Sequence, residues 1–91
     1  MKIRILLRGP IARYLDSTEM EYEVSEGSKI TDVMHILLRE KKLKETWQSV
    51  DEMNREALIL HNEVDIELLE GLNTPLQDKD NITILPLIHG G

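Results

Sequence analysis

The sequence predicts a single α+β domain in which helices cover one face of a mixed β-sheet. Three observations lead to this fold class. The chain has 91 residues, a length that suits one domain. Segments with the alternation of strands stand near both ends, and a segment with helical spacing lies between them. Their order is strand, strand, helix, a shorter helical stretch, and then three more strands.

Two alternating segments near the start predict an antiparallel pair of strands. In residues 2–8 apolar side chains alternate with lysine and arginine, and in residues 19–24 they alternate with glutamate. The outer faces are therefore basic on one strand and acidic on the other. Such pairs contribute roughly 0.2–1 kcal/mol each when they lie opposite one another. Gly9-Pro10 begins the connecting loop, which we expect to span about ten residues.

Helical spacing begins after the second strand. Apolar residues recur there at intervals of three and four, which predicts a helix over residues 31–42 with Thr31 as its N-cap. A shorter helical stretch is expected next, because Leu43, Trp47 and Val50 share a helical face. We expect Trp47 to cover the core rather than to form a platform for a ligand.

The second half of the chain predicts three strands joined by turns. Residues 57–60 form a continuous apolar run, which is typical of a strand buried on both faces. Asn62-Glu63 predicts a turn into a short strand at 64–67, and the final strand begins at Ile82. Pairing should weaken at Pro86, which has no N–H to donate. The predicted core consists of Ile3, Ile5, Leu7, Val24, Val33, Leu37, Leu58, Leu60, Ile82 and Ile84.

Composition makes several classes of function improbable. The net charge of −6 repels phosphate backbones, so direct binding of nucleic acid is not expected. The chain has no cysteine, and His35, His61 and His89 lack the spacing of a helical zinc site. No apolar stretch is long enough for a secretory leader or a membrane span. We therefore expect a cytoplasmic protein with no membrane contact, no bound metal or cofactor, and no enzymatic activity of its own.

Charge is divided unevenly along the chain. Residues 1–45 carry 9 basic and 8 acidic side chains, whereas residues 46–91 carry 2 basic and 9 acidic ones. Two explanations stay open at this point. The acidic half either keeps the protein in solution or attracts a basic partner, for which complementary charge mainly raises the association rate.

The end of the sequence is apolar and uncharged. No Asp, Glu, Lys or Arg occurs from Asn81 to Gly91, and the last two residues are glycines. Glycine loses more backbone entropy on ordering than any other residue, so this ending does not serve stability. We expect residues 87–91 to form a flexible tail of the single domain 1–91. Such a tail is slim enough to carry a terminal carboxylate into a narrow channel of another protein.

Together these features resemble the ubiquitin-like β-grasp sulfur carriers. That superfamily includes the small subunit of molybdopterin synthase, the thiamine-pathway carrier ThiS, and the ubiquitin-related modifiers with their archaeal small-modifier relatives. The resemblance follows the element order of the whole chain, and two turns depart from it at Asn62-Glu63 and Lys79-Asp80. It is strongest from Ala57 onward, in Asp65-Ile66-Glu67-Leu68-Leu69, Gly71, Thr74-Pro75-Leu76, Asp78, Asp80 and Gly90-Gly91.

The resemblance implies a carrier with a mixed sheet packed on one main helix. An ATP-dependent adenylyltransferase similar to ubiquitin-activating enzymes would adenylate the Gly91 carboxylate, and a sulfur donor would convert it to a thiocarboxylate. A tRNA thiolase would accept the sulfur, or the carboxyl group would be joined to lysines of target proteins. The partners would contact Leu85, Leu87, Ile88, His89 and Gly90.

Two other functions stay open. The chain could be the small subunit of molybdopterin synthase, with its tail held in the large subunit that accepts the sulfur. Alternatively, it could be a β-grasp interaction module whose two terminal glycines have no chemical role.

Overall fold

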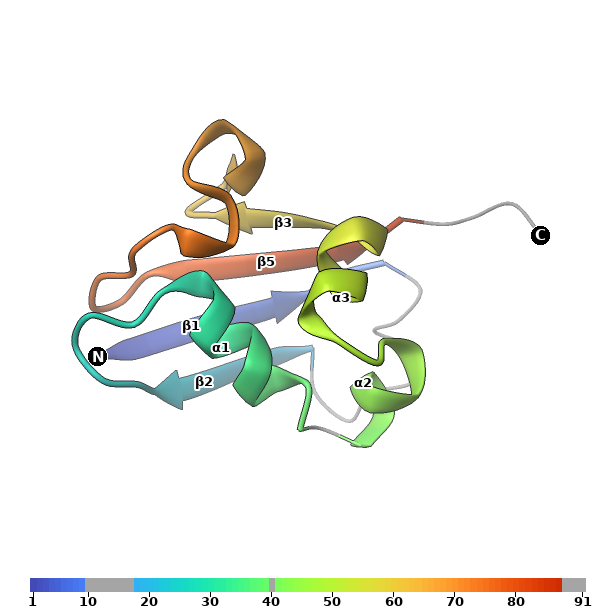
Figure 1. Cartoon of the computed structure of the whole chain (residues 1–91). Coiled ribbons are helices and arrows are strands. Elements are labelled where there is room, and N and C mark those ends of the chain that lie inside the picture. Colours follow the sequence, from blue (N-terminus) through green and yellow to red (C-terminus); the bar gives the residue numbers. More distant parts are fainter. Residues whose placement is uncertain (10–17, 40, 88–91) are drawn as a thin grey trace.

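The structure is a computed structural model that describes residues 1–9, 18–39 and 41–87, without the side chains of residues 41 and 42. Its strands form one sheet, and its helices lie on one face of that sheet (Figure 1). The elements are β1 (Lys2–Leu7), β2 (Glu19–Glu23), α1 (Ile30–Leu37), α2 (Lys41–Thr46), α3 (Val50–Glu56), β3 (Ala57–His61), β4 (Val64–Asp65), the 3₁₀ helices η2 (Ile66–Leu68) and η3 (Gly71–Asn73), and β5 (Asn81–Pro86). The predicted α+β class is confirmed.

The sheet is mixed, with strand order β2-β1-β5-β3-β4. β1 runs parallel to β5, and the other neighbours are antiparallel. The predicted pairing of basic and acidic outer faces is confirmed, because Arg4 lies opposite Glu21 and its Nε is 3.0 Å from Glu19 Oε1. Most of the predicted connecting loop falls on residues 10–17, outside the described residues.

The core lies between the sheet and the helices. Eight of the ten predicted core residues are buried there. The helices and the loop before β5 add further buried side chains, among them Ile30, Met34, Leu43, Trp47, Met53, Ile66 and Leu76. Trp47 is 1% exposed, so it belongs to the core as expected.

The prediction that residues 57–60 are buried on both faces is wrong. Ala57 and Ile59 are buried, whereas Leu58 and Leu60 are only half buried. Successive strand residues point to opposite faces, so Leu58 and Leu60 lie on the face away from the helices. A run that is apolar at every position gives no indication of which alternate residues face the core.

α1 ends earlier than predicted, at Leu37 instead of residue 42. Its buried face would continue at residues 41 and 44, and both are lysines. A new helix, α2, therefore begins with a different direction and buries Leu43 (Figure 1). The sequence pattern did not separate α2 from α3, which follows it.

The start of α1 also differs from the prediction, since its N-cap is Lys29 and not Thr31. The backbone N–H of Lys29 donates to Asp32 Oδ2 at 2.8 Å. Asp32 thus accepts from the N-cap backbone in the manner of a capping box, and its charge suits the helix N-terminus. None of the described helices is long and apolar enough to cross a membrane.

The strand predicted at residues 64–67 is only Val64–Asp65. The chain then enters η2, where the Asp65 side chain accepts from the Glu67 N–H at 2.9 Å and Ile66 turns into the core. The Asp65 side chain thus caps η2 at the point where the strand was expected to continue.

The predicted turn at Asn62-Glu63 is confirmed. Its residues have φ values of 49° and 71°, and Lys79 in the turn before β5 has a φ of 70°. These left-handed conformations are the ones that glycine adopts most easily. The two turns that depart from the family pattern therefore keep a glycine-like backbone although Glu63 and Lys79 carry side chains.

Candidate functional site

The end of β5 forms the base of the predicted C-terminal tail. Pairing weakens at Pro86 on one side only: the β1–β5 ladder ends at Leu7 and Ile84, whereas on the β3 side the Leu87 N–H still donates to Glu56 O at 2.8 Å. N–H groups alternate in direction along a strand, so the nitrogen of Pro86 points to the β1 side. On that side the last hydrogen bond of the β1–β5 ladder is donated by the Arg8 N–H to Ile84 O at 3.0 Å, just before Pro86. The missing N–H of Pro86 is therefore the donor that would continue this ladder to Arg8, and the expected weakening is confirmed on the β1 side.

Leu85 and Leu87 are the predicted contact residues that the structure describes. Leu85 is half buried opposite Leu58, and Leu87 is 50% exposed. Gly9 borders Leu85 with a φ of 81°, and a Cβ at this position would lie only 3.0 Å from Leu85 Cδ1. The glycine therefore allows the end of β1 to pass close to Leu85. The other predicted site residues lie outside the described residues; they are Ile88, His89, Gly90 and Gly91.

These two leucines belong to an apolar patch on the face of the sheet that the described helices leave open. The pairing register and strand alternation put Leu58 opposite Leu85 on this face. They also put Leu60 and Leu6 on either side of Thr83. We call this set the open-face patch, and its members are Leu6, Leu58, Leu60, Leu85 and Leu87.

Thr83 lies at the centre of the open-face patch. It is 3% exposed, and its Oγ1 has no hydrogen-bond partner within the described residues. Buried polar groups are usually paired, so a lone hydroxyl among leucines is an unusual feature.

The sequence prediction missed three members of this patch. It assigned Leu58 and Leu60 to the core and gave Leu6 no role. One signal was available in the apolar run at residues 57–60. A strand that is apolar on both faces, in a domain with helices for only one face, indicates a second surface suited to a partner.

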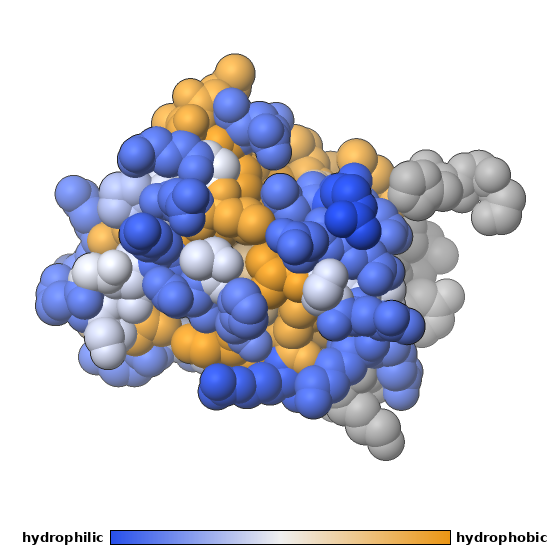
Figure 2. Space-filling view, viewed as in Figure 1, coloured by the Kyte–Doolittle hydropathy of each residue, from blue (hydrophilic) through white to orange (hydrophobic). Residues whose placement is uncertain are grey.

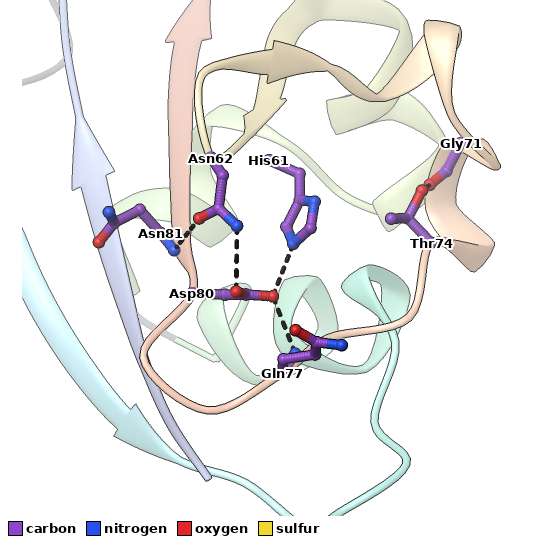
Figure 3. A network of polar contacts seen from close by, with 7 residues as sticks. All are labelled: His61, Asn62, Gly71, Thr74, Gln77, Asp80 and Asn81. Atoms are coloured by element: carbon purple, nitrogen blue, oxygen red, sulfur yellow. Dashed lines mark hydrogen bonds and ion pairs between the residues drawn. The ribbon is translucent and has the colours of Figure 1, made fainter.

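A polar network holds the opposite end of β5 (Figure 3). Asp80 accepts hydrogen bonds from the Gln77 N–H at 2.8 Å and from Asn62 Nδ2 at 3.0 Å. Its Oδ2 also lies 2.6 Å from His61 Nε2, and Asn62 Oδ1 accepts from the Asn81 N–H at 2.8 Å. The network therefore ties the β3–β4 turn to the turn that starts β5.

Asp80 is ionised in this network. Burial alone would raise its pKa, but hydrogen bonds from His61, Asn62 and the Gln77 N–H outweigh that effect and hold the pKa below the ordinary value of 3.8. The carboxylate thus acts as a structural acceptor with three donors around it.

The structure describes two of the three histidines, His35 and His61. His35 is exposed on α1 with Nδ1 2.9 Å from Thr31 O, and His61 ends β3. His89 lies outside the described residues. Within residues 1–9, 18–39 and 41–87, no group of three or more His, Cys, Asp or Glu could hold a metal ion.

Comparison with known proteins gives a family match over residues 5–91, to the ThiS family. The chain belongs to the ThiS family. It is 34% identical to the ubiquitin-related modifier 1 homolog of Dictyostelium discoideum, and the match covers 100% of both chains.

Solved structures agree with this assignment. The small archaeal modifier protein 1 of Methanosarcina acetivorans superposes with a TM-score of 0.76 at 28% identity, over 99% of this chain and 96% of that one. A complex of subunits 1 and 2 of the molybdopterin-converting factor from Helicobacter pylori matches with a TM-score of 0.68 at 25% identity, over 100% of both chains. The protein is thus a ubiquitin-like β-grasp member of the sulfur-carrier and modifier class, and such proteins are carriers rather than catalysts.

Proposed function

We propose that Gly91 is the reacting residue of this carrier. A partner adenylyltransferase activates the Gly91 carboxylate with ATP, which releases pyrophosphate and leaves an acyl-adenylate. A sulfur donor then displaces AMP and leaves a thiocarboxylate. The protein itself binds neither ATP nor a cofactor in this scheme, and we place it in the cytoplasm.

The position of Leu87 is the observation that supports this proposal most. Leu87 is the last described residue, and its N–H bond to Glu56 O fixes the chain at the end of β5, beside the start of β3. Residues 88–91 come next in the sequence. If extended, they reach roughly 13–14 Å at about 3.3–3.6 Å per residue. That length suits delivery of a carboxylate into a recessed active site.

The open-face patch is the surface that we propose for docking the activating enzyme and the sulfur acceptor. Its leucines lie directly beside the start of the tail, so a partner that covers them also receives the C-terminus.

The acceptor that we propose first is a tRNA thiolase, with lysines of target proteins as a second kind of acceptor. The match to a ubiquitin-related modifier over the full length of both chains supports this choice. The likeness to the molybdopterin-converting factor, solved as a complex of its two subunits, favours an alternative. In that alternative the chain is the small subunit of molybdopterin synthase, and the large subunit accepts the sulfur.

The proposal is tested by intact-mass spectrometry after incubation with the activating enzyme, ATP and a sulfur donor. We expect a species heavier by one exchange of oxygen for sulfur, with the change located at Gly91. Reactions without ATP should leave the mass unchanged. Gly90→Val should fold normally but form little product, because a β-branched side chain does not fit a channel shaped for bare backbone. A full-length chain that never gains sulfur would contradict the proposal. The protein would then be better described as a β-grasp interaction module.

A further inference from the structure

The segment from Glu63 to Glu70 projects from the fold as an apolar and acidic tip. Leu68 is 79% exposed, Leu69 is 43% exposed and Val64 is 41% exposed. Figure 2 shows this hydrophobic surface over η2, at the top of the view. The same segment contains four carboxylates and no basic residue; the carboxylates are Glu63, Asp65, Glu67 and Glu70.

The tip is well anchored, so its exposed leucines do not result from a loose loop. Ile66 fixes it in the core at 1% exposure, and the Leu69 N–H donates to Ile66 O at 2.9 Å. At its base the Glu70 N–H donates to Thr74 Oγ1 at 3.2 Å, and that hydroxyl donates to Gly71 O at 2.7 Å (Figure 3). An ordered surface that exposes two adjacent leucines is a candidate contact site.

A hollow elsewhere on the same molecule has the complementary chemistry. It has a volume of about 550 Å³ and lies where α1, α2 and α3 meet. Leu38, Trp47 and Val50 supply its apolar lining, and Arg39, Lys44 and His35 supply basic groups. Among the described residues that line it there is no carboxylate. In a chain of net charge −6, this is a locally basic site.

We infer that the tip of one molecule docks in the hollow of a second copy. Leu68 and Leu69 would enter the apolar part, while Glu67 and Glu70 would meet Arg39 and Lys44. The contact uses two different surfaces, so it is head-to-tail and each new molecule presents a free hollow and a free tip. The area involved is small, so we expect a weak contact with a dissociation constant on the order of 1 mM. Neither surface includes Leu85 or Leu87.

The contact is tested by NMR on the ¹⁵N-labelled full chain from about 50 µM to about 1 mM, with sedimentation velocity on the same samples. At low salt we expect the amide shifts of residues 64–70 and 35–50 to change together with concentration. The average mass should rise without stopping at a dimer. Raising the salt to about 0.3 M should reverse both effects, because it screens the charge pairs.

Two variants separate the two halves of the contact. Leu68→Ser removes the most exposed apolar side chain of the tip, and Arg39→Glu reverses a charge at the hollow. Each variant alone should therefore remain monomeric. Mixed together, they should form a one-to-one complex, because Leu68→Ser keeps the hollow and Arg39→Glu keeps the tip. The matched controls Leu87→Ser and Arg8→Glu change exposed residues outside both surfaces and should associate like the parent. The inference is overturned by a parent chain that shows no concentration dependence, by variants that associate like the parent, or by a mixture that does not interact.

Discussion

At the residue scale, Asp80 shows how one buried carboxylate organises the start of β5. Its partners His61 and Asn62 come from the β3–β4 hairpin, 19 and 18 residues earlier in the chain. Sequence analysis placed Asp80 in a turn and a strand directly before His61, and both positions are correct. It could not predict that the two side chains are in contact. Contacts between residues so far apart in the chain depend on strand register, and the local apolar pattern does not determine that register.

The charge of Asp80 predicts a dependence of stability on pH. Since folding lowers its pKa, the carboxylate contributes stability fully above the unfolded value near 3.8, and this contribution is lost as the pH falls through the lower folded pKa. Asp80→Asn should lower the free energy of unfolding at pH 7 by about 1.5–3 kcal/mol, because it removes hydrogen bonds to a charged group. The difference from the parent should shrink in acid. Urea denaturation at several pH values measures both effects, and Glu26→Gln at an exposed turn is the isosteric control. A difference that stays constant from neutral pH into acid would contradict the ionised network.

At the scale of elements, the kind and order of most segments followed from the sequence, and their ends did not. α1 stops where its apolar stripe meets lysines, and β4 stops where the Asp65 side chain caps η2. The apolar pattern alone placed neither limit. The assignment of faces on β3 failed for a related reason, because alternation gives no signal when every residue of the run is apolar.

The faces of β3 give a paired prediction for stability. Ile59 is 2% exposed on the helix side, so Ile59→Ala should cost about 2–5 kcal/mol of unfolding free energy. Leu58→Ala should cost clearly less, because Leu58 is only half buried and its open-face side already contacts water. Denaturation of the two variants under the same conditions provides the comparison. Equal losses would mean that the open face is as closely packed as the core.

At the scale of the whole molecule, the fold separates the core from the surface that we propose for docking. The core lies between the sheet and the helices, whereas the open-face patch and the end of β5 face outward. Sequence analysis located the tail and two of the patch leucines from their apolar, uncharged character. The remaining patch members became visible only with the sheet order, which brings β1, β3 and β5 together on one surface.

The docking role that we propose for the open-face patch predicts a kinetic effect without a loss of fold. Leu87→Asp should raise the KM of the activating enzyme for this protein about tenfold or more, as expected for a residue central to an interface. Its thermal midpoint should stay close to that of the parent, because Leu87 is 50% exposed. Val64→Asp, at an exposed apolar residue beside the far end of β3 from Leu87, is the matched control and should leave KM unchanged. An unfolded Leu87→Asp variant would show instead that this residue supports the core.

Activation of the Gly91 carboxylate is the central claim, and ATP–pyrophosphate exchange by the activating enzyme tests it most directly. The full chain should support exchange, and a chain that lacks Gly91 should remain folded and support almost none. Removing one residue shortens the tail by about 3.3–3.6 Å. Misplacement by even about 1 Å can cost roughly a hundredfold in rate. Exchange by the shortened chain at the rate of the full chain would contradict the claim.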